Sequence, residues 1–160
     1  MNIKDKLKVM DEIAAANRQH VEDWKMANHK IKGVLIDTVK GTAEVVEIDK
    51  SLDEYYKVLN CRCIDIVQRC IGGKAFDIIC DDEAALVDSP LPSAASPLGE
   101  VMLYGNLFVV KFDGEEDVES LTDEDVAHIF DNLLKLHVLM DGASHVHTVL
   151  DNVTYGGGHL

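Results

Sequence analysis

The chain has 160 residues, of which 47% are hydrophobic and 28% charged, and its formal net charge is −14. This length and apolar content predict one folded domain with a real core, and they exclude a chain that is disordered throughout. A surface this negative repels phosphate backbones, so no direct nucleic-acid binding is expected. The charge can instead attract a basic protein surface, imitate DNA, or simply maintain solubility.

The charge is unevenly distributed along the chain. Residues 1–30 hold six basic and five acidic side chains, whereas the rest holds nine basic and 24 acidic ones, a net charge of −15. The start, MNIKDKLKVMDE, lacks the apolar region of a signal peptide, and no stretch of about 20 apolar residues predicts a membrane span. We therefore expect a cytoplasmic location, no membrane partner and reduced cysteines.

Residues 3–28 are predicted to form one helix. Apolar residues recur there at steps of three and four, namely Ile3, Leu7, Met10, Ile13, Ala14, Val21 and Trp24. Such a helix can pack on the domain, pair with another chain or contact a partner. It makes a homo-oligomer through the amino-terminal helix one expected arrangement.

The periodicity changes to that of strands from Ile31 onward. The pattern predicts a hairpin of strands 31–39 and 43–48 around Lys40-Gly41. A short helix, about 52–59, follows, with Ser51 as N-cap and Glu54 completing a capping box. A second hairpin is expected from Cys61–Cys70 and Ala75–Cys80 around the turn Gly72-Gly73, ending at Asp81-Asp82-Glu83.

The second half contains a long loop and a second clear helix start. All three prolines, Pro90, Pro92 and Pro97, fall in residues 84–98, which we expect to be an irregular loop. A final strand is predicted at Leu107 to Phe112. The last helix is expected to begin at the N-cap Thr122. Its buried stripe would comprise Val126, Ile129, Phe130, Leu133, Leu136, His137 and Met140, with Asp141-Gly142 ending it.

This order of elements predicts an α+β fold with a mostly antiparallel sheet of about five strands, flanking helices and a separate amino-terminal helix. The expected organisation is an amino-terminal helix over 1–30, an α+β domain over 31–142 and a flexible tail over 143–160.

No catalytic signature stands out, so no enzyme activity and no cofactor are expected. Cys61, Cys63, Cys70 and Cys80 follow C-x-C-x₆-C-x₉-C, which differs from zinc-binding spacing and favours buried thiols. His145 and His147 would share one face of a strand and could chelate a metal. However, no acidic residue or third histidine lies at a sequence spacing typical of a third metal ligand. Gly72-Gly73-Lys74 lacks the upstream glycine of a phosphate loop.

The segments FDIICDDE, LPSAAS, GNLFVVKFDGE and SLTDEDV together resemble the DUF3846 family, a domain of unknown function common in phages and mobile elements. The resemblance covers roughly Ile31 to Leu136. Its best points are Asp81-Asp82-Glu83, Ser96, Gly105-Asn106, Phe112-Asp113-Gly114 and Leu121-Thr122. It implies a context and no mechanism, because small accessory proteins of such elements often interfere with host functions, including immunity.

The first functional hypothesis is a non-enzymatic binding protein of a phage or mobile element that interferes with a host process by binding a host protein. Its working surface would be the proline-containing loop of residues 84–98 and the adjoining acids. The second is a sponge for a small signalling nucleotide, which needs cationic or amide groups such as Arg69. The third is a metal-dependent hydrolase. Candidate binding residues are Lys74, Asp81, Asp82, Glu83, Ser93, Ser96, Asn106 and Lys111.

Overall fold

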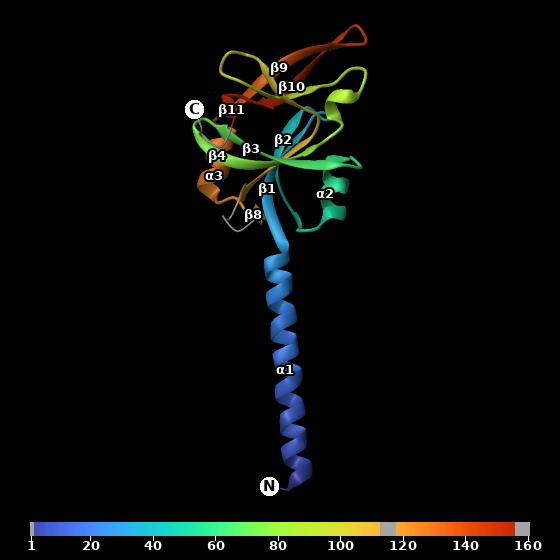
Figure 1. Cartoon of the computed structure of the whole chain (residues 1–160), viewed down its shortest axis with the longest axis vertical. Helices are drawn as coiled ribbons and strands as arrows, with labels where there is room; N and C mark the ends of the chain where they lie inside the picture. The colour runs from blue at the N-terminus through green and yellow to red at the C-terminus, as the bar shows by residue number, and fades with distance from the viewer. Residues whose placement is uncertain (1, 113–117, 156–160) are drawn as a thin grey trace. The chain divides into compact units, whose positions relative to one another are not determined.

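The first thirty residues form a unit of their own, made of the single helix α1 (Ile3–His29) (Figure 1). The helix predicted from the three- and four-residue spacing is confirmed. Asn2 caps it, because its side-chain oxygen accepts a hydrogen bond from the backbone N–H of Asp5 (2.9 Å). This structure is a computed structural model that describes residues 2–112 and 118–155, without the side chains of 17–29, 112, 138 and 140.

The second unit, residues 31–160, is built on a seven-stranded sheet. Its strands run in the order β11-β3-β4-β7-β1-β2, and β8 pairs with β7. The strands are β1 (Lys30–Asp37), β2 (Thr42–Asp49), β3 (Ile64–Ile71), β4 (Lys74–Asp81), β7 (Leu107–Phe112), β8 (Val118–Glu119) and β11 (Val153–Tyr155). The hairpin turn at Gly72-Gly73 is confirmed, since both glycines have positive φ and strand β3 pairs antiparallel with β4.

A second sheet of four strands runs in the order β6-β5-β10-β9. It comprises β5 (Pro92–Ala95), β6 (Val101–Tyr104), β9 (Leu133–Met140) and β10 (Ala143–Leu150). Strands β5 and β10 are parallel, whereas β9 and β10 form a long antiparallel hairpin. The α+β class with mostly antiparallel strands is therefore confirmed, with more strands than the five expected.

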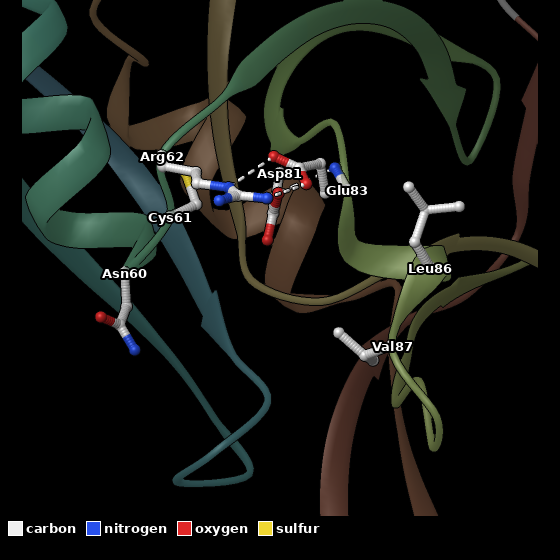
Figure 2. A pocket seen from close by; sticks show the side chains of 7 residues that line it. All are labelled: Asn60, Cys61, Arg62, Asp81, Glu83, Leu86 and Val87. Atoms are coloured by element: carbon white, nitrogen blue, oxygen red, sulfur yellow. Dashed lines mark hydrogen bonds and ion pairs between the residues drawn. The ribbon is translucent and has the colours of Figure 1, made fainter.

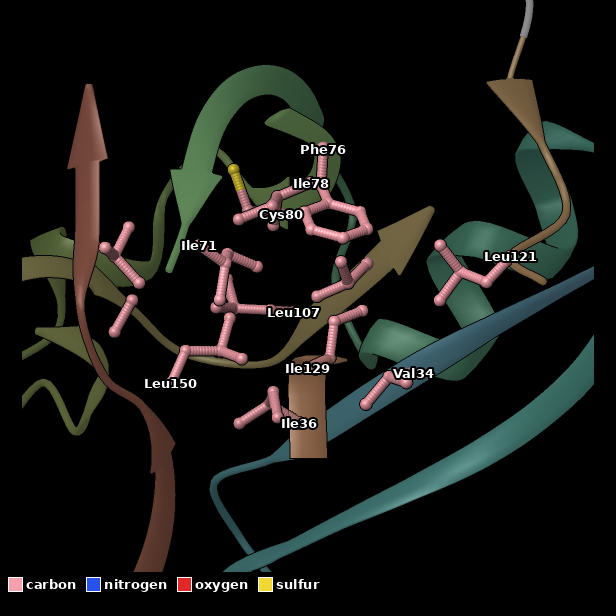
Figure 3. Packing of buried hydrophobic residues seen from close by; sticks show 13 residues of the cluster. Val34, Ile36, Ile71, Phe76, Ile78, Cys80, Leu107, Leu121, Ile129 and Leu150 are labelled. Carbon is pink, nitrogen blue, oxygen red and sulfur yellow. The ribbon is translucent and has the colours of Figure 1, made fainter. Parts of the chain in front are cut away.

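Each central strand of the seven-stranded sheet is buried on both faces, because its side chains alternate between two clusters. The cluster in Figure 3 comprises Val34, Ile36, Ile71, Phe76, Ile78, Cys80, Ala94, Leu107, Val109, Leu121, Ile129, Leu150 and Val153. The opposite cluster comprises Ile31, Leu35, Tyr55, Leu59, Ile79, Phe108, Val110 and Val118. Gly33 permits this packing, since a Cβ there would lie 2.5 Å from the Phe108 ring.

Two short helices cover the two faces. Helix α2 (Leu52–Leu59) contributes Tyr55 and Leu59 to one cluster, and α3 (Asp123–Phe130) contributes Ile129 to the other (Figure 1). Both begin at the expected N-cap. The Ser51 hydroxyl accepts from Glu54 N–H, which is one half of the expected capping box, whereas Thr122 and Asp125 form a complete reciprocal box. Among the described residues, no helix is long and apolar enough to cross a membrane.

The expected continuation of the last helix to residue 140 is wrong. Helix α3 ends at Phe130, and Leu133–Met140 form strand β9. Asp141-Gly142 make the turn to β10 with φ values of 52° and 78°, a sequence that suits a hairpin as well as a helix end. His137, expected in the core, is exposed on β9.

The expected tail and loop also differ from the structure. Residues 143–150 and 153–155 form strands β10 and β11, so the compact unit does not end at residue 142; residues 156–160 lie outside the described residues. The segment 84–98 is not wholly irregular, since it holds the 3₁₀ turn η1 (Ala84–Leu86) and β5. Strand β7 is confirmed at Leu107–Phe112, but it is not the final strand.

Candidate functional site

Two adjoining pockets lie between the segment after α2 and the segment after β4. The larger, of about 480 Å³, is lined by Asn60, Cys61, Arg62, Asp81, Glu83, Leu86 and Val87 (Figure 2). The smaller, of about 190 Å³, shares Asn60, Asp81 and Val87 with it and extends to Thr38, Val39, Leu59, Ala84, Ser89, Leu91, Gly105 and Asn106. We call the two together the loop cleft, because residues 84–91 form one of its walls.

The walls of the larger pocket are fastened to each other. The Arg62 guanidinium donates two hydrogen bonds to the Glu83 carboxylate, at 2.9 and 2.7 Å, as Figure 2 shows. The backbone N–H of Asp82 donates to the carbonyl of Cys63 (3.1 Å), and that of Glu83 donates to the Asp81 carboxylate (2.9 Å). The geometry of the acidic turn is thus fixed by backbone and side-chain bonds.

The smaller pocket has a buried amide in its lining. The Asn106 side-chain oxygen accepts from the backbone N–H and the hydroxyl of Thr38, both at 2.8 Å, and its amide nitrogen donates to the Leu59 carbonyl (3.3 Å). Asn106 therefore joins three segments of the chain. Gly105 beside it has φ of 75°, and a Cβ there would lie 2.6 Å from Ala84, so glycine lets η1 pack closely.

The cleft combines negative charge with exposed apolar side chains. Hydrogen bonds from Arg62, and then from Cys63, lower the pKa of Glu83 to about 2, so its carboxylate stays ionised at neutral pH. Leu86 and Val39 each expose 79% of their surface, and Val87 exposes 57%. Of the described residues that line the two pockets, Arg62 is the only cation, and Glu83 neutralises it.

The thiols near the cleft are held in their protonated form. Burial, and then the charge of Asp81, raise the pKa of Cys61, while a hydrogen bond to Glu83 raises that of Cys63. Burial raises the pKa of Cys80 to about 11. Cys61 and Cys63 precede strand β3, so the expectation that they lie within a strand is wrong. Protonated thiols are poor nucleophiles and poor metal ligands.

Lys74 and Lys111, expected at a binding surface, both point to one buried carboxylate. The Lys74 ammonium donates to Asp125, and the Lys111 ammonium lies 3.2 Å from the other Asp125 oxygen. The Asp125 side chain is fully buried. Burial favours the neutral acid, but hydrogen bonds from Lys74, Thr122 and Lys111 outweigh it and hold the pKa of Asp125 well below its usual range. The Asp125 charge therefore engages both cations.

The other expected residues are divided between separate places. Asp82 is exposed and lies outside the described linings of the loop cleft. Ser93 is fully buried on β5, and its hydroxyl has no hydrogen-bond partner among the described residues. The Ser96 hydroxyl accepts from the backbone N–H groups of Leu98 and Glu100, so it organises a turn. Arg69 lies over the Tyr155 ring, 5.0 Å from its centroid.

His145 and His147 share a strand, β10, as expected, with ring centroids 6.5 Å apart. His147 is buried, and neither of its ring nitrogens has a partner among the described residues. Within residues 2–112 and 118–155, no group of three or more His, Cys, Asp or Glu side chains is placed to hold a metal ion. The pair therefore offers at most two ligands from the described chain.

Sequence reasoning missed two residues of the cleft. Asn60 and Arg62 line it, yet neither was expected there, whereas Leu86 and Val87 lie in the loop of residues 84–98 that was expected to form the working surface. Asn60 ends α2 with φ of 52°, a left-handed cap that asparagine tolerates and that the pattern helix-then-Asn can reveal. No local signal brings Arg62 to Glu83, 21 residues away, because the pairing depends on the β3–β4 hairpin.

The structure belongs to the α+β class. It has a domain of two sheets with an open cleft at the end of β4, and the amino-terminal helix forms a separate unit. Residues 31–134 match the family model described as Domain of unknown function (DUF3846). The chain therefore belongs to the DUF3846 family, as its motifs indicated. No curated protein and no solved structure matches the chain.

Proposed function

We propose that this chain is a non-enzymatic binding protein that holds a segment of a partner protein in the loop cleft. The observation that carries the proposal is the combination, in one open cleft, of the Asp81 carboxylate with the exposed apolar side chains Leu86 and Val87. The Glu83 carboxylate is already paired with Arg62. Such a surface suits a peptide that presents a lysine or arginine next to a large apolar residue.

The charge of the chain supports this choice of partner. The net charge of −14 attracts basic surfaces and accelerates their association. The partner would be a host protein and the setting a cytoplasmic process, such as immunity, with which a phage or mobile element interferes. The host partner, the cytoplasmic setting and the phage or mobile-element context are predictions based on the sequence resemblance to the family.

The nucleotide sponge has less support from the site. A phosphate needs free cations or backbone N–H groups. Arg62 faces Glu83, and Lys74 and Lys111 face Asp125, so each of these three cations has an anionic partner within the protein. A metal-dependent hydrolase has less support again, because within residues 2–112 and 118–155 no group of three or more His, Cys, Asp or Glu side chains is placed to hold a metal ion.

A peptide-binding assay tests the proposal directly. We would measure fluorescence polarisation of labelled peptides that carry an Arg-Leu or Lys-Phe pair, alongside peptides with glutamate in place of the cation. We expect the basic peptides to bind, and D81N to weaken binding about tenfold, which corresponds to about 1.4 kcal/mol. The matched control is D82N, which removes a neighbouring charge that lies outside the described cleft linings. Equal binding by D81N, D82N and the wild type would contradict the assigned site.

Native mass spectrometry of protein purified from a host-cell extract separates the alternatives. An added host polypeptide that D81N fails to retain would support the proposal. A mass excess of a few hundred daltons would instead identify a trapped small molecule and favour the sponge. Elemental analysis of the same sample would reveal a metal and revive the hydrolase.

A further inference from the structure

Helix α1 presents an apolar face for which the chain itself suggests an occupant. Ile3, Leu7 and Met10 expose 75%, 55% and 64% of their surface. A helix of 27 residues is about 40 Å long. Isolated helices are marginally stable in water, and most helices in proteins are stabilised by packing of an apolar face. The exposed apolar residues in the first half of the helix therefore indicate a packing partner.

The spacing of the face identifies the kind of partner. From Ile3 onward, alternating steps of four and three residues reach Leu7, Met10, Ala14, Asn17, Val21, Trp24 and Asn28. This is a heptad repeat, in which Leu7, Ala14, Val21 and Asn28 occupy a positions and Ile3, Met10, Asn17 and Trp24 occupy d positions. Apolar residues fill six of these eight positions, and the exposed apolar residues Val9 and Ile13 lie outside them. Apolar residues at a and d positions over several heptads are the signature of a coiled coil. A helix that packs on a globular core usually shows a wider, less regular stripe.

We propose that α1 pairs with α1 of a second copy of this chain in a parallel, in-register, two-stranded coiled coil. In that arrangement each seam position lies opposite the same position of the second copy, so position 17 is opposite position 17. In a fully overlapped antiparallel pair, Asn17 would face Ala14 and Asn28 would face Ile3. That arrangement would set both asparagine positions of the seam opposite apolar residues, which is an unfavourable pairing.

One flanking charge pair agrees with the parallel arrangement. Lys6 occupies a g position and Asp11 the following e position, so each Lys6 approaches Asp11 of the second copy, twice in the pair. The helix segment itself, residues 1–30, has six basic and five acidic residues and hence little net repulsion. The inference does not depend on the loop cleft, which lies in the other unit.

Analytical ultracentrifugation of the full chain tests the pairing. We expect a mass of about 35 kDa, twice the 17.7 kDa of one chain, at micromolar concentration. The double variant L7E/M10E places four carboxylates in the seam of the pair and should give single chains. The matched control A15E/A16E adds the same charge at exposed positions outside the seam and should remain paired. A single chain of wild type at 100 μM, a trimer or tetramer, or a paired L7E/M10E would overturn the proposal.

Two further variants test orientation and do not depend on how L7E/M10E folds. N17C should form a disulfide between copies on air oxidation far faster than A15C, because only a parallel in-register seam brings position 17 against itself. Equal rates would overturn the register. N17V should tighten association at least tenfold, since it removes a polar pair from the seam. Unchanged or weaker association of N17V would contradict burial of Asn17 in the seam.

Discussion

The two units of the chain depend on contacts of opposite kinds. Within α1 the contacts are local, such as the Asn2 cap, and its apolar residues Ile3, Leu7 and Met10 are exposed. The second unit, called the body below, depends on pairs distant in sequence, for example Leu150 beside Ala94 and Thr38 bonded to Asn106. We infer that helix α1 is stabilised by pairing with a second copy of the chain. The body is stabilised by contacts between segments that are distant in its own sequence. The following predictions test that difference.

The largest expected difference in the stability of the body is between deletion of the carboxy-terminal strands and deletion of the amino-terminal helix. Deletion of residues 143–160 removes β10 and β11, which carry the buried residues Val149, Leu150 and Val153. We expect this body to lose its cooperative urea transition, monitored by circular dichroism, because both sheets lose a strand. Deletion of residues 1–30 should leave that transition within about 0.5 kcal/mol of the wild type. A folded 1–142 fragment would refute the comparison.

The next effect concerns the buried carboxylate. We expect D125N to destabilise the body by about 3 kcal/mol at pH 7, because it leaves Lys74 and Lys111 without their anion. The control D123N removes a carboxylate that is 99% exposed and should cost less than about 0.5 kcal/mol. The free energy of unfolding of the wild type and both variants, measured by urea denaturation, tests this difference.

The same carboxylate predicts a dependence on pH. The folded-state pKa of Asp125 lies below its unfolded value of about 3.9. Its contribution is therefore fully present above that unfolded value and is lost as the pH falls toward the folded pKa. The difference between the wild type and D125N should shrink below about pH 4. A constant difference from pH 7 to pH 3 would show that charge is not the cause.

A smaller difference in stability is expected between the variants of two asparagines, Asn106 in the body and Asn2 in the helix cap. N106A should cost the body about 2 kcal/mol, because it leaves the Thr38 N–H and the Leu59 carbonyl buried without a partner. N2A removes an exposed helix cap and should lower the stability of α1 by about 1 kcal/mol without moving the body transition. Thermal scans of the full chain, followed at a helix-sensitive and a tertiary signal, distinguish the two.

The smallest effect concerns two serines of the second sheet. S93A removes a buried hydroxyl that has no partner among the described residues, so it should be neutral or stabilise the body by up to about 1 kcal/mol. S96A removes the acceptor of two backbone N–H groups and should cost about 1 kcal/mol. A destabilised S93A would show that its hydroxyl has a partner.

The sequence predicted the elements whose signals are local. The turns at Gly41 and Gly72-Gly73 and the cap at Ser51 each mark a boundary within a few residues. Strand β9 was missed because Leu133, Leu136 and Met140 fit a helical spacing, and the choice depends on pairing with β10. Strand β5, Pro-Ser-Ala-Ala, has little strand propensity and is held by β6 and β10.

The candidate site was predicted only where a local sequence signal marks its residues. Asp81 and Glu83 follow a strong strand signal, and the structure places both at the cleft. Lys74 and Lys111 are 37 residues apart in the sequence, and no local pattern shows that they meet at Asp125. Asn106 was expected as a ligand-binding group, whereas its described bonds go to Thr38 and Leu59.

The late position of β10 and β11 has a consequence during synthesis. The ribosome makes these strands after the other strands of the two sheets, so until then β3 lacks its neighbour β11 and β5 lacks β10. At ordinary elongation rates, on the order of 10 s separates residue 30 from residue 155. During that time the nascent body has open strand edges, which favour aggregation. Helix α1 is made before every strand, so the pairing proposed above would bring two nascent chains on one message together while their sheets are still incomplete.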